Sequence, residues 1–164
     1  MVTCQYCTPE WLEQGKKSFD ANPNLRESLK TLSKKMCYKI KADPAWGIDQ
    51  DIIFGAFFEK GQLTKLAFFS EDAARAEADF ILAATPQEWK KLLRKENKFA
   101  IDFMKGHVKL EKGTLAGVLT IAPHADRIVN AITQVPLQFP DEMSPEELSA
   151  YRTYMNSFRE SLGV

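Results

Sequence analysis

The stretch that most constrains the fold is Asp51–Ser70, "DIIFGAFFEKGQLTKLAFFS", which has the pattern of two strands joined by a turn near Gly61. Bulky apolar residues stand at both odd and even positions, so Ile53 and Phe57 share one face while Phe54 lies on the other. A sheet with one solvated face needs apolar residues on only one side. The sequence therefore predicts a hairpin that is covered by apolar groups on both sides, at least locally.

Helix signals surround this hairpin. Thr8, Thr85 and Ser144 each precede a proline, and this pairing is typical of an N-cap followed by the first helical residue. Thr85 and Ser144 also have Glu three positions later, which completes a capping-box pattern. The expected elements, in order, are a helix from residue 9, a helix at 25–36 capped by Asn24, strands at 37–42 and within 51–70, a short helical or turn connection at 74–79, a strand at 79–85, helices from 86 and at 98–106, a strand at 107–111, helical segments at 114–122 and 124–135 separated by Pro123, a proline linker at 136–143, and a helix from 145.

This order, helices first and then strands with interspersed helices, predicts an α+β fold with a hairpin-rich sheet covered by helices on one face. The chain of 164 residues carries 22 basic and 22 acidic residues, and this balance argues against a nucleic-acid partner. No signal peptide is evident, and no window reaches the length of about 20 apolar residues that a membrane-spanning helix needs. Three cysteines, an odd number, disfavour a disulfide framework, so we expect a reducing cytoplasm.

The residues that could carry chemistry are few. Cys4 and Cys7 form a CxxC pair, but a structural zinc site needs four ligands and a redox pair should follow a strand. The two histidines, His107 and His124, stand at expected element boundaries, and no nucleophile motif accompanies them. The glycines form neither a phosphate loop nor a dinucleotide fingerprint. We therefore expect no catalytic residue, no metal and no cofactor, and the protein is not expected to be an enzyme.

What remains is an apolar surplus, since eleven of the eighteen aromatic residues are Phe, which has no polar group. These side chains exceed what one side of a short sheet needs, so they predict either an apolar ligand cavity or a buried dimer interface. The fifteen candidates for lining it are Phe54, Phe57, Phe58, Phe68, Phe80, Leu82, Trp89, Leu92, Leu93, Phe99, Phe103, Met104, Val108, Leu110 and Val118.

Two stretches, "ADFILAATPQEWKKLL" and "FMKGHVKLEKGTLAGVL", resemble the sterol carrier protein type 2 family of non-specific lipid-transfer domains. The chain departs from the family at Thr114, where Asp is frequent, and at "RKENK", where glycine is common. The residues that carry the resemblance are Asp79 with Phe80 and Leu82, Leu92 with Leu93, Phe103 to Gly106, Val108 to Leu110, and Gly113 with Leu115.

The resemblance implies a five-stranded, mostly antiparallel sheet, an apolar tunnel between the layers, and binding without chemistry of a fatty acid, acyl-CoA or sterol-like lipid. It divides the chain into an N-terminal helical extension (1–23), a sterol-carrier-like domain (24–137), and a proline linker with an extra amphipathic helix (138–164). The alternatives are a homodimeric interaction protein and an accessory subunit of an enzyme of lipid or isoprenoid metabolism. A transient membrane contact and a homodimer stay open as partners.

Overall fold

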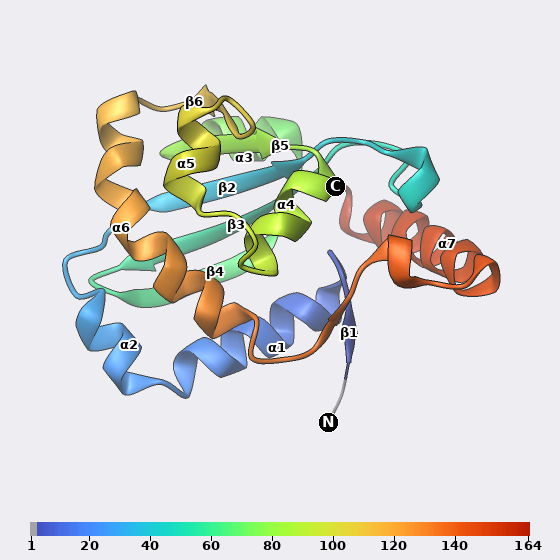
Figure 1. The fold of residues 1–164 in the computed structure, drawn as a ribbon, viewed down its shortest axis with the longest axis horizontal. Coiled ribbons are helices and arrows are strands. Elements are labelled where there is room, and N and C mark those ends of the chain that lie inside the picture. Colours follow the sequence, from blue (N-terminus) through green and yellow to red (C-terminus); the bar gives the residue numbers. More distant parts are fainter. Residues whose placement is uncertain (1–2) are drawn as a thin grey trace.

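A computed structural model of the chain describes residues 3–164, and a five-stranded sheet lies at its centre (Figure 1). The strand order is β4-β3-β2-β5-β6. β2 and β5 run parallel, whereas the other three neighbouring pairs are antiparallel. The predicted α+β class, with a five-stranded and mostly antiparallel sheet, is confirmed. The strands span Lys35–Ile40 (β2), Ile52–Glu59 (β3), Gln62–Phe69 (β4), Phe80–Ala84 (β5) and Lys109–Lys112 (β6).

Helices cover the two faces of the sheet unequally. In Figure 1, α4, α5 and α6 lie in front of the sheet and α3 lies behind it, while α1 packs against β4 and α6. The larger apolar core fills the space under the front helices, and a smaller cluster that includes Ile53, Phe57 and Ala74 lies on the α3 side. Both faces of the hairpin are therefore covered, as predicted. The helices span Pro9–Asp20 (α1), Pro23–Ser28 (α2), Glu71–Glu77 (α3), Pro86–Leu93 (α4), Phe99–Met104 (α5), Leu115–Ile132 (α6) and Pro145–Leu162 (α7).

Local signals in the sequence fix several of these boundaries. Lys60 and Gly61 both have positive φ (50° and 81°), the backbone of a two-residue turn whose twist matches the strands that it joins. The side chains of Thr8, Thr85 and Ser144 each accept a hydrogen bond from a backbone N–H of the helix that follows. The predicted hairpin and the three predicted helix starts are confirmed.

The predicted helix over 25–36 is wrong beyond Ser28. α2 ends there, its N-cap is Asn22 instead of Asn24, and the chain turns before entering β2. The apolar residues whose spacing predicted a helix do not all belong to one helix. Met36 instead belongs to a central strand, where it pairs with Ala56 and Phe80. Pairing with two neighbouring strands overrides a local helical pattern.

The predicted break at Pro123 is also wrong, because α6 is one continuous helix with this proline inside it. Proline has no N–H, so the helix lacks one bond to the carbonyl one turn earlier. The apolar face nevertheless continues across the proline, since Val118, Ile121 and Ile128 are all buried. His124 consequently lies within a helix and not at the start of one.

A strand near the N-terminus pairs beside the main sheet with a strand that precedes α7. β1 (Cys4–Gln5) pairs in parallel with β7 (Leu137–Gln138), and the 3₁₀ helix η2 (Pro140–Glu142) leads on to α7. α7 packs on the segment between β2 and β3, which contains the 3₁₀ helix η1 (Pro44–Trp46). The expected division at residues 23 and 137 stays a prediction, although side chains from all three parts share the larger core.

Candidate functional site

An apolar cavity of about 90 Å³ lies between the sheet and the helices on its front face. Strand residues form its floor: Phe54, Ala56 and Phe58 alternate along β3 with the intervening side chains on the other side of the sheet. Seven of the fifteen residues that the sequence singled out line it. They are Phe54, Phe58, Leu82, Trp89, Leu92, Leu93 and Phe99.

The other eight candidates lie outside this lining. Phe57 is in the cluster on the α3 side of the sheet, and the ring of Phe68 packs 5.2 Å from that of Phe158 on α7. The side chain of Met104 is 76% exposed. The remaining five lie in or against the larger core, and they are Phe80, Phe103, Val108, Leu110 and Val118.

Sequence reasoning missed the part of the wall that comes from α1, β2 and α6. The wrong helix over 25–36 hid Met36, whereas Tyr38 fell in the predicted strand at 37–42 but was not singled out as a wall residue. No sequence signal indicated that α6 crosses over the cavity. The wall residues from α1 and α6 are Phe19, Ile121, Ala125, Asp126, Ile128, Val129 and Ile132.

Polar groups in the lining are sparse and nearly all have partners. The indole N–H of Trp89 donates to the backbone carbonyl of Lys39 at 3.0 Å. The hydroxyl of Tyr38 donates to the sulfur of Met36, and burial raises the pKa of this phenol above its usual range. Asp126 is the one charged residue in the lining, and it is exposed, so the wall reaches solvent along α6. The interior therefore offers surface to apolar groups and little to ions.

Tyr6 forms part of the cavity wall, and α7, which supplies no lining residue, contacts Tyr6. Tyr6 lines the cavity and is 1% exposed, and its ring packs against those of Trp11 and Phe139. The hydroxyl of Tyr151 on α7 donates to the backbone carbonyl of Tyr6. Burial raises the pKa of both phenols well above their usual value. The C-terminal helix thus holds the N-terminal segment in place at the cavity.

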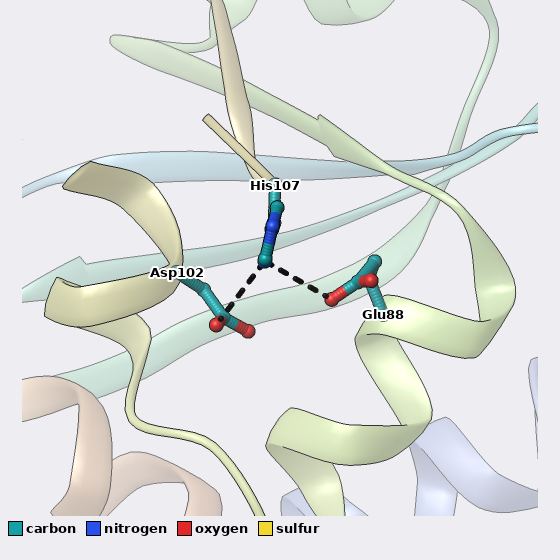
Figure 2. A group of neighbouring side chains, drawn as sticks. All are labelled: Glu88, Asp102 and His107. Atoms are coloured by element: carbon teal, nitrogen blue, oxygen red, sulfur yellow. Dashed lines mark ion pairs between the residues drawn. The ribbon is translucent and has the colours of Figure 1, made fainter. Parts of the chain in front are cut away.

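Figure 2 shows a polar group in which Glu88 from α4, Asp102 from α5 and His107 point toward one another. The Nδ1 atom of His107 lies 3.6 Å from Asp102 Oδ1 and 3.8 Å from Glu88 Oε2. Asp102 is 2% exposed and accepts a hydrogen bond from Asn97, which also lines the cavity. Glu88 Oε2 is buried and has no hydrogen-bond partner among residues 3–164.

The three ligand atoms of this group lie within 4.8 Å of one another, and imidazole with two carboxylates is a donor set that suits several divalent metals. Within residues 3–164 it is the group that could hold a metal ion. His107 lies near the surface, with its side chain 46% exposed. The sequence did not reveal the two carboxylates beside it, since they come from two different helices.

The cysteines are poorly placed for nucleophilic chemistry. Cys4, Cys7 and Cys37 are free and buried. Burial raises the pKa of all three thiols, that of Cys37 to about 12 and that of Cys7 further. A thiol with a raised pKa is a weak nucleophile near neutral pH, because the thiolate is the reactive form.

No protein-family model matches the chain, and no curated protein sequence matches it either. Solved structures do match. A crystal structure of sterol carrier protein 2 has a TM-score of 0.68 and 21% identity, covering 78% of this chain and 97% of its own. The solution structure of a conserved hypothetical protein from Thermus thermophilus has a TM-score of 0.70 and 21% identity, covering 80% of this chain and 90% of its own. The chain has the sterol carrier protein 2 fold.

A more distant structure agrees, since apo sterol carrier protein 2 from Yarrowia lipolytica has a TM-score of 0.53 at 16% identity, covering 76% of this chain and 89% of its own. The resemblance that the sequence predicted is thereby confirmed for the sterol carrier protein 2 fold. Within residues 3–164, no helix is both long enough and apolar enough to cross a membrane.

Proposed function

We propose that this protein binds the apolar chain of a lipid in the cavity under α6, without chemistry on the bound molecule. The observation that carries the proposal is the lining, in which twenty-one residues contribute one charge, that of Asp126, and seven aromatic side chains. The names of the similar structures, sterol carrier protein 2, support the same reading. Carriage of the lipid between sites is the wider role that this binding would serve.

The energetics favour a loosely selective carrier. Each methylene group removed from water contributes about 0.8 kcal/mol, so ten of them supply about 8 kcal/mol before ordering costs. That gross free energy corresponds to a dissociation constant of about 1 μM. Apolar walls supply it without directional contacts, so we propose that chain length and head-group charge matter more than detailed shape.

The cavity has to widen to accept such a ligand, because its volume of about 90 Å³ is below the range of about 300–1,000 Å³ typical of ligand pockets. We propose that α6 moves outward. It contributes six wall residues while packing on α1 and α5, and Pro123 removes one of its internal hydrogen bonds. The bound lipid chain would replace contacts that side chains of the cavity wall now make with one another.

The test is native mass spectrometry of freshly purified protein, followed by removal of lipid and titration with a fluorescent polyene fatty acid. Ala125→Trp places an indole in the cavity from α6, whereas Ala150→Trp makes the same change at an exposed helical position on α7. We expect loss of binding for the first variant and unchanged binding for the second. Absence of bound lipid and of any saturable probe binding would refute the proposal.

A further inference from the structure

Large apolar side chains are exposed mainly in one region of the surface. Among residues 3–164, six such side chains are exposed, and four of them belong to α5 and the first two turns of α6. α5 and α6 pack against each other and lie side by side in Figure 1. The four side chains and their exposed fractions are Ile101 (51%), Met104 (76%), Leu115 (57%) and Leu119 (50%).

Each pair projects from one side of its helix. Ile101 and Met104 are three positions apart, and Leu115 and Leu119 are four apart, which are the spacings of residues on a common face. The opposite sides of the same helices carry the buried Asp102 of α5 and the buried core residues of α6. The exposed side chains therefore have no role in the core, and we call their common surface the α5–α6 face.

Positive charge accompanies the α5–α6 face. Between residues 98 and 125 the only acidic residues are Asp102, which is buried, and Glu111, which pairs with two lysines of β2 and its extension. Lys98, Lys105 and Lys109 in the same segment are exposed and form no ion pair within residues 3–164. Lys98 and Lys105 flank α5 on the side of Ile101, since all three fall on steps of three and four.

From this combination we propose that the α5–α6 face docks on an anionic lipid membrane. Apolar side chains that are bordered by lysine suit the boundary between head groups and acyl chains, where the apolar part inserts and the lysines meet anionic lipids. A second copy of the chain fits this face less well, because a symmetric interface would bring the unpaired lysines of one copy close to those of the other.

The location of the α5–α6 face connects membrane docking with lipid binding in the cavity, and this part of the inference rests on the proposed function. Phe99 of α5 and Ile121 and Ala125 of α6 line the cavity from the inner sides of the helices whose outer sides carry the face. Contact with a membrane would therefore act on the wall of the cavity that must move to admit a ligand. A lipid chain could then pass between bilayer and cavity without crossing water.

The test is flotation of the delipidated protein with phosphatidylcholine vesicles, with and without phosphatidylglycerol. Met104→Ser and Leu119→Ser should each weaken binding about tenfold, as expected for a large apolar side chain withheld from the membrane. Lys98→Gln combined with Lys105→Gln should weaken binding to anionic vesicles about thirtyfold, as expected for two lysines near a charged surface. Two matched controls, Leu162→Ser on α7 and Lys17→Gln on α1, should bind as the unchanged protein does.

Three results would overturn the docking proposal: no enrichment on anionic vesicles, equal binding by the face variants and the controls, or dimerisation of the vesicle-free protein that the face variants abolish. Binding of the fluorescent fatty acid in vesicle-free solution is measured on the same variants. Loss of vesicle binding with retained probe binding supports the docking face, whereas failure of probe binding in every variant counts against the proposed function alone.

Discussion

Ala56→Leu tests the cavity from the side of the sheet. Ala56 is 5% exposed, lies on β3 between Met36 and Leu66 of the neighbouring strands, and lines the cavity. A void of about 90 Å³ costs about 2 kcal/mol at about 24 cal/mol per Å³. A leucine adds three carbon atoms to that void, so we expect it to recover about 1–2 kcal/mol of unfolding free energy. For a chain of this size, that gain raises the melting temperature by about 2–4 °C per kcal/mol.

The same change should weaken lipid binding. Three carbon atoms occupy space that a bound chain would use, and withholding about 2 kcal/mol of burial corresponds to a dissociation constant about thirtyfold larger. Urea unfolding of lipid-free protein gives the stability, and titration with a fluorescent fatty acid gives the affinity. Ala67→Leu is the matched control, because Ala67 lies on β4 against the cluster on the α3 side.

The two measurements have to move in opposite directions. A variant that is more stable yet binds the probe as tightly as the unchanged protein would show that the ligand does not use this cavity. A variant destabilised by more than about 1 kcal/mol would show overpacking, and with it that no usable void adjoins Ala56. Weakened probe binding by the Ala67→Leu control would refute the assignment of the site to the front face of the sheet.

Four further predictions concern the frame around the cavity. The cysteines should resist a thiol reagent at pH 8 in the native protein and react fully in urea, because burial raises their pKa values. Lys39 is 4% exposed, and its ion pairs with Glu71 and Glu111 lower the pKa of both carboxyl groups against the opposing effect of burial. The stabilisation from these pairs is therefore present above about pH 4 and is lost as the pH falls further. In urea titrations, Lys39→Met should lower the free energy of unfolding by about 1–3 kcal/mol at pH 7 and by less at pH 3. Tyr151→Phe should lower the free energy of unfolding by about 1–2 kcal/mol in the same assay, since it leaves the carbonyl of Tyr6 unpaired. Gly117→Ala should lower it by about 1–3 kcal/mol, because a Cβ at this position would lie 2.5 Å from the Phe80 ring.

Local chemistry was sufficient to predict much of this fold. The turn at Gly61 and the three helix caps depend on residues within four positions of one another, so the sequence carries their whole cause. The start of β2 is not determined locally, because Met36 is a strand residue only through its pairing with β3 and β5. Pro123 also misled, since a helix whose apolar face is held by packing tolerates one missing hydrogen bond.

The candidate site was predictable to the extent that it follows alternation along a strand. Phe54 and Phe58 were expected on one face and Phe57 on the other, and the structure agrees. The sequence could not tell which face holds the cavity, because both are apolar. Contributions from α1 and α6 depend on the path of helices over the sheet, and so does the meeting of Glu88 with His107.

The pairing of β1 with β7 bears on the order in which the molecule is assembled. These strands pair Cys4 and Gln5 with Leu137 and Gln138, so their pairing has to wait for most of the polypeptide. Closing such a long loop carries a larger entropic cost than the neighbouring contacts of the β3–β4 hairpin. Tyr6 follows β1 directly and therefore completes the cavity wall late. A chain that is still emerging from the ribosome thus forms the sheet before the cavity is complete.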